Sequence, residues 1–134
     1  MIPSRNKILT TDLTVNTMPS EQHRMQLQGN RIFGICDGLD AIKQTIYKIL
    51  NTERYAYIIY SWNYGIELAD LFGQAPLFVC PEVERRVKEA LLQDDRITAV
   101  DQFQFDTAKK GIVAVTFTVH TIYGDVEESL EVNI

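Results

Sequence analysis

Residues 37–65 form the stretch DGLDAIKQTIYKILNTERYAYIIYSWNYG, and this stretch decides the fold that the sequence predicts. In its first half, apolar side chains recur at helical spacing, at Leu39, Ile42, Ile46, Ile49 and Leu50. Asp37 precedes them as an N-cap, and Asp40 places a negative charge in the first turn. The pattern therefore predicts an amphipathic helix over residues 38–52.

The second half of this stretch is apolar and rich in tyrosine. Residues 55–60, YAYIIY, are mostly aromatic and β-branched, and such side chains pack well on a pleated surface. The sequence predicts a strand here, followed by a turn over residues 61–65. Trp62 has two interpretations, an anchor in a protein interface or a buried core residue.

Toward the N-terminus, residues 23–36 (HRMQLQGNRIFGIC) predict two short strands joined at Gly29-Asn30, a pair typical of hairpin turns. Residues 1–22 contain two prolines and many Ser, Thr and Asn residues without sustained periodicity. We expect them to form an arm that is ordered only when a partner holds it. Residues 23–134 are expected to form one domain.

Toward the C-terminus, residues 66–72 predict one short helical segment ended by Gly73. Pro81 is expected to open a second helix, since its missing N–H costs nothing in the first turn. The buried stripe of that helix comprises Val83, Val87, Ala90 and Leu91. Glu84 with Lys88, and Arg85 with Glu89, have the spacing of ion pairs on a solvated helix face.

From Ile97 to the end, the pattern is that of strands. Apolar residues alternate in ITAVDQFQF (97–105), IVAVTFTVHTIY (112–123) and the last nine residues, with a break in parity near Val100 that indicates a bulge. These segments predict a three-stranded antiparallel meander. The expected fold class is α+β, with two main helices packed on one face of a mostly antiparallel sheet.

Composition narrows the classes of function. The chain has 134 residues, enough for one core, and a net charge of −5, which disfavours binding to a nucleic-acid backbone. Cys36 and Cys80 are expected to be reduced thiols, and they cannot form a zinc cage with His23 and His120. No apolar run is long enough to insert into a membrane, and the N-terminus lacks an apolar signal core, so we expect a cytoplasmic protein.

Catalytic signatures are weak. Glu67 with Asp70, or Asp94 with Asp95, offer paired carboxylates, but such spacings are usually solvated charges or caps. No nucleophile elbow accompanies the histidines, and the glycines form no phosphate loop. The sequence therefore predicts a protein that is not an enzyme, with no catalytic residue, no cofactor and no metal.

The sequence contains four segments in a fixed order: the capped helix, LNTERYAYIIYSWNYGIELADLFG (50–73), the helix ending in ALLQDDRITAV (90–100), and the meander. In that order, over residues 30–134, the sequence resembles the baseplate wedge proteins of contractile phage tails. It is most similar to the XkdS-type branch found in PBSX-like defective prophages. The wider family includes the small baseplate subunit of type VI secretion systems.

The resemblance implies candidate partner-binding residues. The family's Glu-Pro-Arg motif, implicated in docking onto other wedge subunits, corresponds to Asp94, Asp95 and Arg96, where Asp95 replaces the proline that would fix φ. The Gly-Glu-Arg motif corresponds to Thr52-Glu53-Arg54, without the glycine. Arg96 can bind a partner's carboxylate or form an ion pair with Asp94, and the resemblance favours the interface. Trp62 is the remaining candidate partner-binding residue.

The resemblance also implies a function. The chain would be a structural component that links the wedge to the first sheath ring, the sheath adding a strand to its sheet. Its partners would be other wedge subunits and the tail sheath protein, first in the bacterial cytoplasm and then in the baseplate of a phage or phage-like tail. Arg96→Glu is expected to leave the isolated protein folded and to block baseplate assembly.

Two alternatives stay open. Family members are often labelled lysozymes, so a tail-associated peptidoglycan hydrolase using Glu67 or Asp70 is one of them. A generic adaptor with no tail connection is the other. Clearing of peptidoglycan would identify the first, and failure to co-purify with tail proteins would identify the second.

Overall fold

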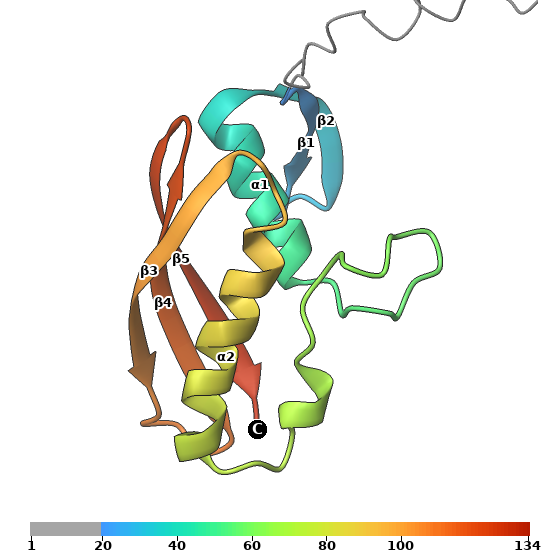
Figure 1. Ribbon diagram of the computed structural model, residues 1–134. Helices are drawn as coiled ribbons and strands as arrows, with labels where there is room; N and C mark the ends of the chain where they lie inside the picture. The colour runs from blue at the N-terminus through green and yellow to red at the C-terminus, as the bar shows by residue number, and fades with distance from the viewer. Residues whose placement is uncertain (1–19) are drawn as a thin grey trace, which may run out of the picture.

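The computed structural model describes residues 20–134 (Figure 1). Most of the expected arm over residues 1–22 therefore lies outside the described residues. Ser20 is buried and its hydroxyl lies 2.9 Å from the Tyr123 hydroxyl. Strands β1 (Gln22–Gln26) and β2 (Arg31–Cys36) pair antiparallel, and the predicted hairpin is confirmed.

Helix α1 (Gly38–Leu50) is the predicted capped helix, and it ends two residues earlier than expected. The Asp37 carboxylate accepts a hydrogen bond from the Gly38 N–H at 2.7 Å. Gln44 and Gln22 tie the β1–β2 hairpin to α1, because the Gln44 amide donates to the Gln22 side chain at 3.0 Å and to the His23 carbonyl at 2.7 Å.

The second helix begins earlier than predicted. After a short 3-10 helix, η1 (Ala69–Leu71), helix α2 runs over Pro76–Leu91. Pro76, not Pro81, occupies the first turn, where its ring presets φ and its missing N–H costs nothing. Pro81 lies inside α2, where it cannot donate to the carbonyl of Leu77. The predicted Glu84–Lys88 and Arg85–Glu89 ion pairs are present.

The C-terminal meander is confirmed. Strands β3 (Ile97–Asp106), β4 (Ile112–Thr121) and β5 (Gly124–Asn133) form one antiparallel sheet in the order β3-β4-β5. The register of β3 shifts twice, between Ile97 and Ala99 and between Asp101 and Gln104, so the expected bulge is present. Strand β5 pairs with β4 without a shift along its whole length.

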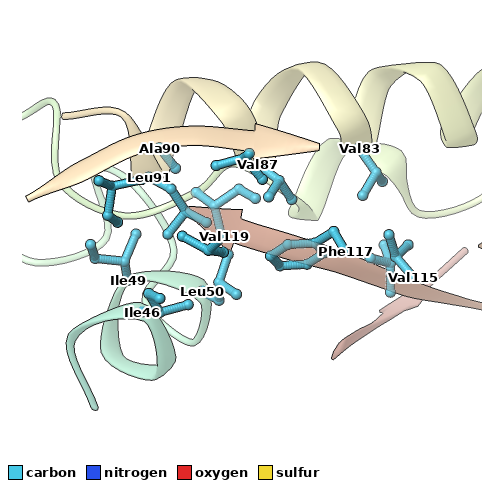
Figure 2. Packing of buried hydrophobic residues seen from close by; sticks show 14 of the residues in the cluster. Ile46, Ile49, Leu50, Val83, Val87, Ala90, Leu91, Val115, Phe117 and Val119 are labelled. Carbon is cyan, nitrogen blue, oxygen red and sulfur yellow. The ribbon is translucent and has the colours of Figure 1, made fainter. Parts of the chain in front are cut away.

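The core lies between this sheet and the two helices, which confirms the α+β class. Side chains of α1, α2 and β4 meet there (Figure 2). The labelled residues are all buried: Ile46, Ile49, Leu50, Val83, Val87, Ala90, Leu91, Val115, Phe117 and Val119. Cys36 is buried, Cys80 is half-buried, and both are free thiols, as expected. Within residues 20–134, no helix is long and apolar enough to cross a membrane.

The strand predicted over residues 55–60 is wrong. These residues belong to a loop between α1 and η1 that projects away from the sheet (the green segment in Figure 1). Strand propensity mainly measures packing against neighbouring strands, and the described chain places no strand beside this run. Tyr55, with φ of 67°, turns the backbone away from the extended region at the start of the run.

Candidate partner-binding surfaces

The loop is closed at its base by backbone pairing. Glu53 and Ile66 form an isolated parallel bridge, in which the Arg54 N–H donates to the Ile66 carbonyl at 3.1 Å and the Ile66 N–H donates to the Thr52 carbonyl at 3.0 Å. We call residues 55–64, between the two sides of this closure, the tyrosine loop. A closed base holds a long connection in one place and leaves its tip free to make contacts.

Gly65 is required at this closure. Its φ is +90°, and a Cβ placed on it would lie 2.5 Å from the carbonyl oxygen of Thr52. That oxygen is fixed by its hydrogen bond to Ile66, so it cannot move aside. Only glycine has both the freedom to adopt this φ and the space for so close a backbone approach.

Glu53 and Arg54 point inward and support the loop from below. The Glu53 carboxylate accepts from the N–H groups of Leu68 and Ala69, each at 3.1 Å, and so satisfies donors at the start of η1. The Arg54 guanidinium donates to the Gly65 carbonyl at 3.1 Å and to Glu89 of α2 at 2.8 Å. Its side chain is 9% exposed. These two predicted partner-binding residues are therefore engaged within the fold.

The tip of the tyrosine loop is apolar and exposed. Ile58 is fully exposed, at 103%, and Trp62 is 81% exposed, so the interpretation of Trp62 as a buried core residue is wrong. Tyr60 stacks on Tyr64 with 4.6 Å between ring centroids. No residue from 55 to 64 carries a charge. A contiguous exposed patch of this kind marks an interaction site more often than it marks an ordinary surface.

Arg86 of α2 secures the segment that follows the loop. Its guanidinium, 11% exposed, donates to the Glu67 carbonyl at 2.8 Å and to the Asp70 carboxylate at 2.9 Å. Asp70 is thereby held as a carboxylate, because the Arg86 hydrogen bond lowers the pKa of Asp70. The α2 face is thus the rigid support of both the loop base and η1.

Asp94, Asp95 and Arg96 form a corner between α2 and β3. The Arg96 guanidinium donates to both Asp94 carboxylate oxygens, at 2.9 and 2.7 Å, and also to the Thr45 hydroxyl of α1 at 3.4 Å. Its side chain is 18% exposed. The self-contained ion pair with Asp94, one of the two interpretations from sequence, is therefore present. Asp95 is exposed.

The corner and the tyrosine loop adjoin each other. The Asn63 amide, next to Trp62, donates to the Gln93 side chain at 3.2 Å, and Gln93 directly precedes Asp94. The structure thus brings Trp62 and Asp95 to neighbouring segments of one surface. The sequence offered no signal for this neighbourhood, since the Asn63–Gln93 hydrogen bond joins side chains 30 residues apart.

Strand β5 presents the second candidate surface, a free sheet edge. The Ile134 N–H donates to the Gly111 carbonyl at 2.9 Å, and this bond fixes the alternation of the β4–β5 ladder. The N–H and C=O groups of five β5 residues therefore face away from β4: Asp125, Glu127, Ser129, Glu131 and Asn133. Within residues 20–134, no strand pairs with them.

Two of the four carboxylates considered for hydrolysis, Asp70 and Asp94, are each held by an arginine. A general acid needs a raised pKa. The side-chain hydrogen bonds of Arg86 and Arg96 instead lower the pKa of Asp70 and of Asp94. Burial raises the pKa of Glu128 on β5, against the opposing charge of Lys43. Among residues 20–134, no group of three His, Cys, Asp or Glu side chains is arranged to hold a metal ion.

Comparison with known proteins gives two matches. A model of the contractile injection system sheath initiator family matches residues 15–124. The chain is also 39% identical, over 113 residues, to the phage-like element PBSX protein XkdS of Bacillus subtilis (strain 168). That alignment covers 81% of this chain and 79% of the relative.

Proposed function

The chain belongs to the contractile injection system sheath initiator family, and from that membership we propose that it links the baseplate wedge to the first ring of the tail sheath. The membership confirms the resemblance drawn from sequence and supports a structural role related to baseplate and sheath. The link has two ends: the sheath adds a strand at the edge of β5, and the wedge binds the corner and the tyrosine loop.

The regular edge of β5 is the observation that carries the proposal. Both β3 and β5 are edge strands, but β3 has two register shifts, and bulges of this kind blunt an edge. Strand β5 keeps ten residues in unbroken register. An incoming strand could therefore bond to successive outward-facing groups along it.

The wedge end of the link uses exposed groups. Asp95 and Trp62 are available to a partner, whereas Asp94, Arg96, Glu53 and Arg54 hold the backbone that presents them. Trp anchors are common among residues that dominate interface energies. The four engaged residues thus act on the partner through the shape of this surface.

Sheath polymerisation tests the proposal. The purified chain, mixed with the sheath protein of the same contractile particle, is expected to seed sheath tubes that are capped at one end by the chain. Ser129→Pro removes an outward-facing N–H without breaking a bond to β4, and should abolish seeding. Ser129→Ala keeps that N–H and should seed normally. Failure of the wild-type chain to bind sheath protein would refute the proposed link.

A further inference from the structure

Three of the five outward-facing residues of the β5 edge carry negative charge. The outward-facing residues Asp125, Glu127 and Glu131 are exposed, and their side chains stand on the solvent face of the sheet, opposite the buried Val126 and Val132. Asp125 is already paired with His120, at 2.7 Å. Glu127 and Glu131 have no ion-pair partner among residues 20–134, so they remain available to a partner strand.

The other side of the same edge is hollow. A groove of 310 Å³ lies beside Glu128. Met25, Leu27 and Tyr47 from the hairpin and α1 line it, together with the charged Arg24, Asp40 and Lys43. A second hollow, of 390 Å³, lies beside Val132, where Leu68 and Phe72 line it together with Glu53, Glu131 and Asn133. Glu128 and Val132 themselves belong to the core-facing set of β5, and alternate side chains of an added strand would point to the same side of the sheet.

A second copy of the chain is a poor occupant of this edge. Two β5 strands paired with each other would bring acidic side chains together, and like charges directly opposite each other destabilise a sheet. An occupant with basic side chains on the solvent face gains from the same positions. The edge therefore selects a different chain.

We propose that the strand that pairs with β5 alternates basic and apolar side chains. Its basic residues face Glu127 and Glu131, and its apolar residues fill the hollows beside Glu128 and Val132. The inference rests on the proposed function and specifies the chemistry of the sheath segment that binds. Backbone bonds supply attachment, and the alternating side chains supply register and selectivity.

A designed strand tests this directly. The probe is a ten-residue segment of alternating Lys and Val, fused to a soluble carrier and titrated against the full chain by fluorescence anisotropy. Replacing Lys by Glu in the probe should weaken binding by roughly tenfold, because opposite charges across the pair become like charges. Replacing Val by Ser should also weaken it, since the hollows are then left unfilled. Equal binding of the Lys and Glu probes would overturn the proposal.

Charge reversal on the chain supplies the matched control. Glu127→Lys should reverse the preference, so that the Glu probe binds more tightly than the Lys probe. Glu21→Lys changes the net charge equally at another exposed position and should leave the preference as it is. The same effect from both variants would refute a specific edge. Thermal melting of each variant confirms that the fold is kept.

The result is separable from the test of the proposed function. A chain that seeds sheath, but whose seeding the Lys–Val probe does not inhibit, contradicts the inferred strand pattern and leaves the sheath link standing. A chain that does not seed sheath contradicts the link itself, whatever the probe does. Inhibition of seeding by the Lys–Val probe and not by the Glu–Val probe supports both.

Discussion

Gly65 is the residue on which closure of the tyrosine loop depends. Gly65→Ala is expected to destabilise the protein by about 2–4 kcal/mol, because alanine would combine a strained positive φ with a backbone clash against Thr52. The free energy of unfolding in urea measures this.

Gly73 provides the comparison for that prediction. It also has a positive φ, of +83°, but a Cβ there would meet nothing within 4 Å. Gly73→Ala should therefore cost only about 1–2 kcal/mol, the conformational part alone. Equal losses at both positions would show that the close approach to Thr52 contributes nothing.

Arg96 stabilises the corner through its contacts within the chain. This changes the expected effect of Arg96→Glu on the isolated protein. Arg96→Glu would place a second carboxylate against Asp94, whose pKa the present pairing lowers. We now expect the isolated chain to lose about 1–3 kcal/mol of stability, as when a partly buried pair is broken. Adding Asp94→Arg to Arg96→Glu should recover part of the loss in chemical denaturation. An unchanged single variant would contradict the structural role.

His120 gives the sheet a pH dependence. Its Nδ1 lies 2.7 Å from Asp125 and its Nε2 lies 2.8 Å from Asp101, and these hydrogen bonds, Asp125 first, raise the pKa of His120. A protonated ring can donate to both carboxylates at once. Since the pKa is higher in the folded state, the stabilisation is complete below the unfolded value of about 6.5 and is lost as the pH rises through the folded value.

The corresponding measurement is the free energy of unfolding over a pH series. In the wild-type protein, stability should fall as the pH rises above about 6.5. His120→Gln removes the titrating group and should flatten this part of the profile. Parallel profiles for the two proteins would mean that the histidine contributes no pH dependence.

At the scale of elements, the sequence predicted regular structure best where one pattern dominates. The apolar stripe of α1 and the alternating apolar residues of β4 each result from burial of one face of the element. Both elements could therefore be predicted. The start of α2 was missed because two prolines, Pro76 and Pro81, both fit a first turn. The strand prediction for residues 55–60 failed because an unbroken apolar run has no period. Whether such a run forms a strand or a loop depends on its tertiary neighbours.

The tyrosine loop should contribute to binding and not to stability. Trp62→Ser is expected to leave the free energy of unfolding within about 0.5 kcal/mol of wild type, because the side chain is already in solvent. Incorporation of the variant into baseplates should fall sharply. Leu77→Ser, at a residue that is 91% exposed outside the loop, should affect neither quantity. A large loss of stability in Trp62→Ser would show that the loop packs against its own domain.

At the scale of the whole molecule, we expect three half-buried arginines to organise the surfaces that partners meet. Arg54, Arg86 and Arg96 each join segments that are distant in sequence, and each is held by an acid and by a backbone carbonyl or a hydroxyl. From sequence, Arg54 and Arg96 were predicted to be partner-binding groups. The ion pair of Arg96 with Asp94 was one of the two interpretations from sequence. The contacts of Arg54 with Glu89 and Gly65 have no local signal in the sequence, so the inward role of Arg54 could not be predicted.

The two ends of the proposed link lie on different elements, which makes them separable in an assembled particle. Asp95→Lys alters only the corner and should prevent incorporation into baseplates, while the purified variant still seeds sheath. Ser129→Pro alters only the β5 edge and should enter baseplates that then carry no sheath. Electron microscopy of particles from each variant distinguishes these products. If both variants stop at the same stage, the two surfaces bind one partner, because independent sites would block assembly at different steps.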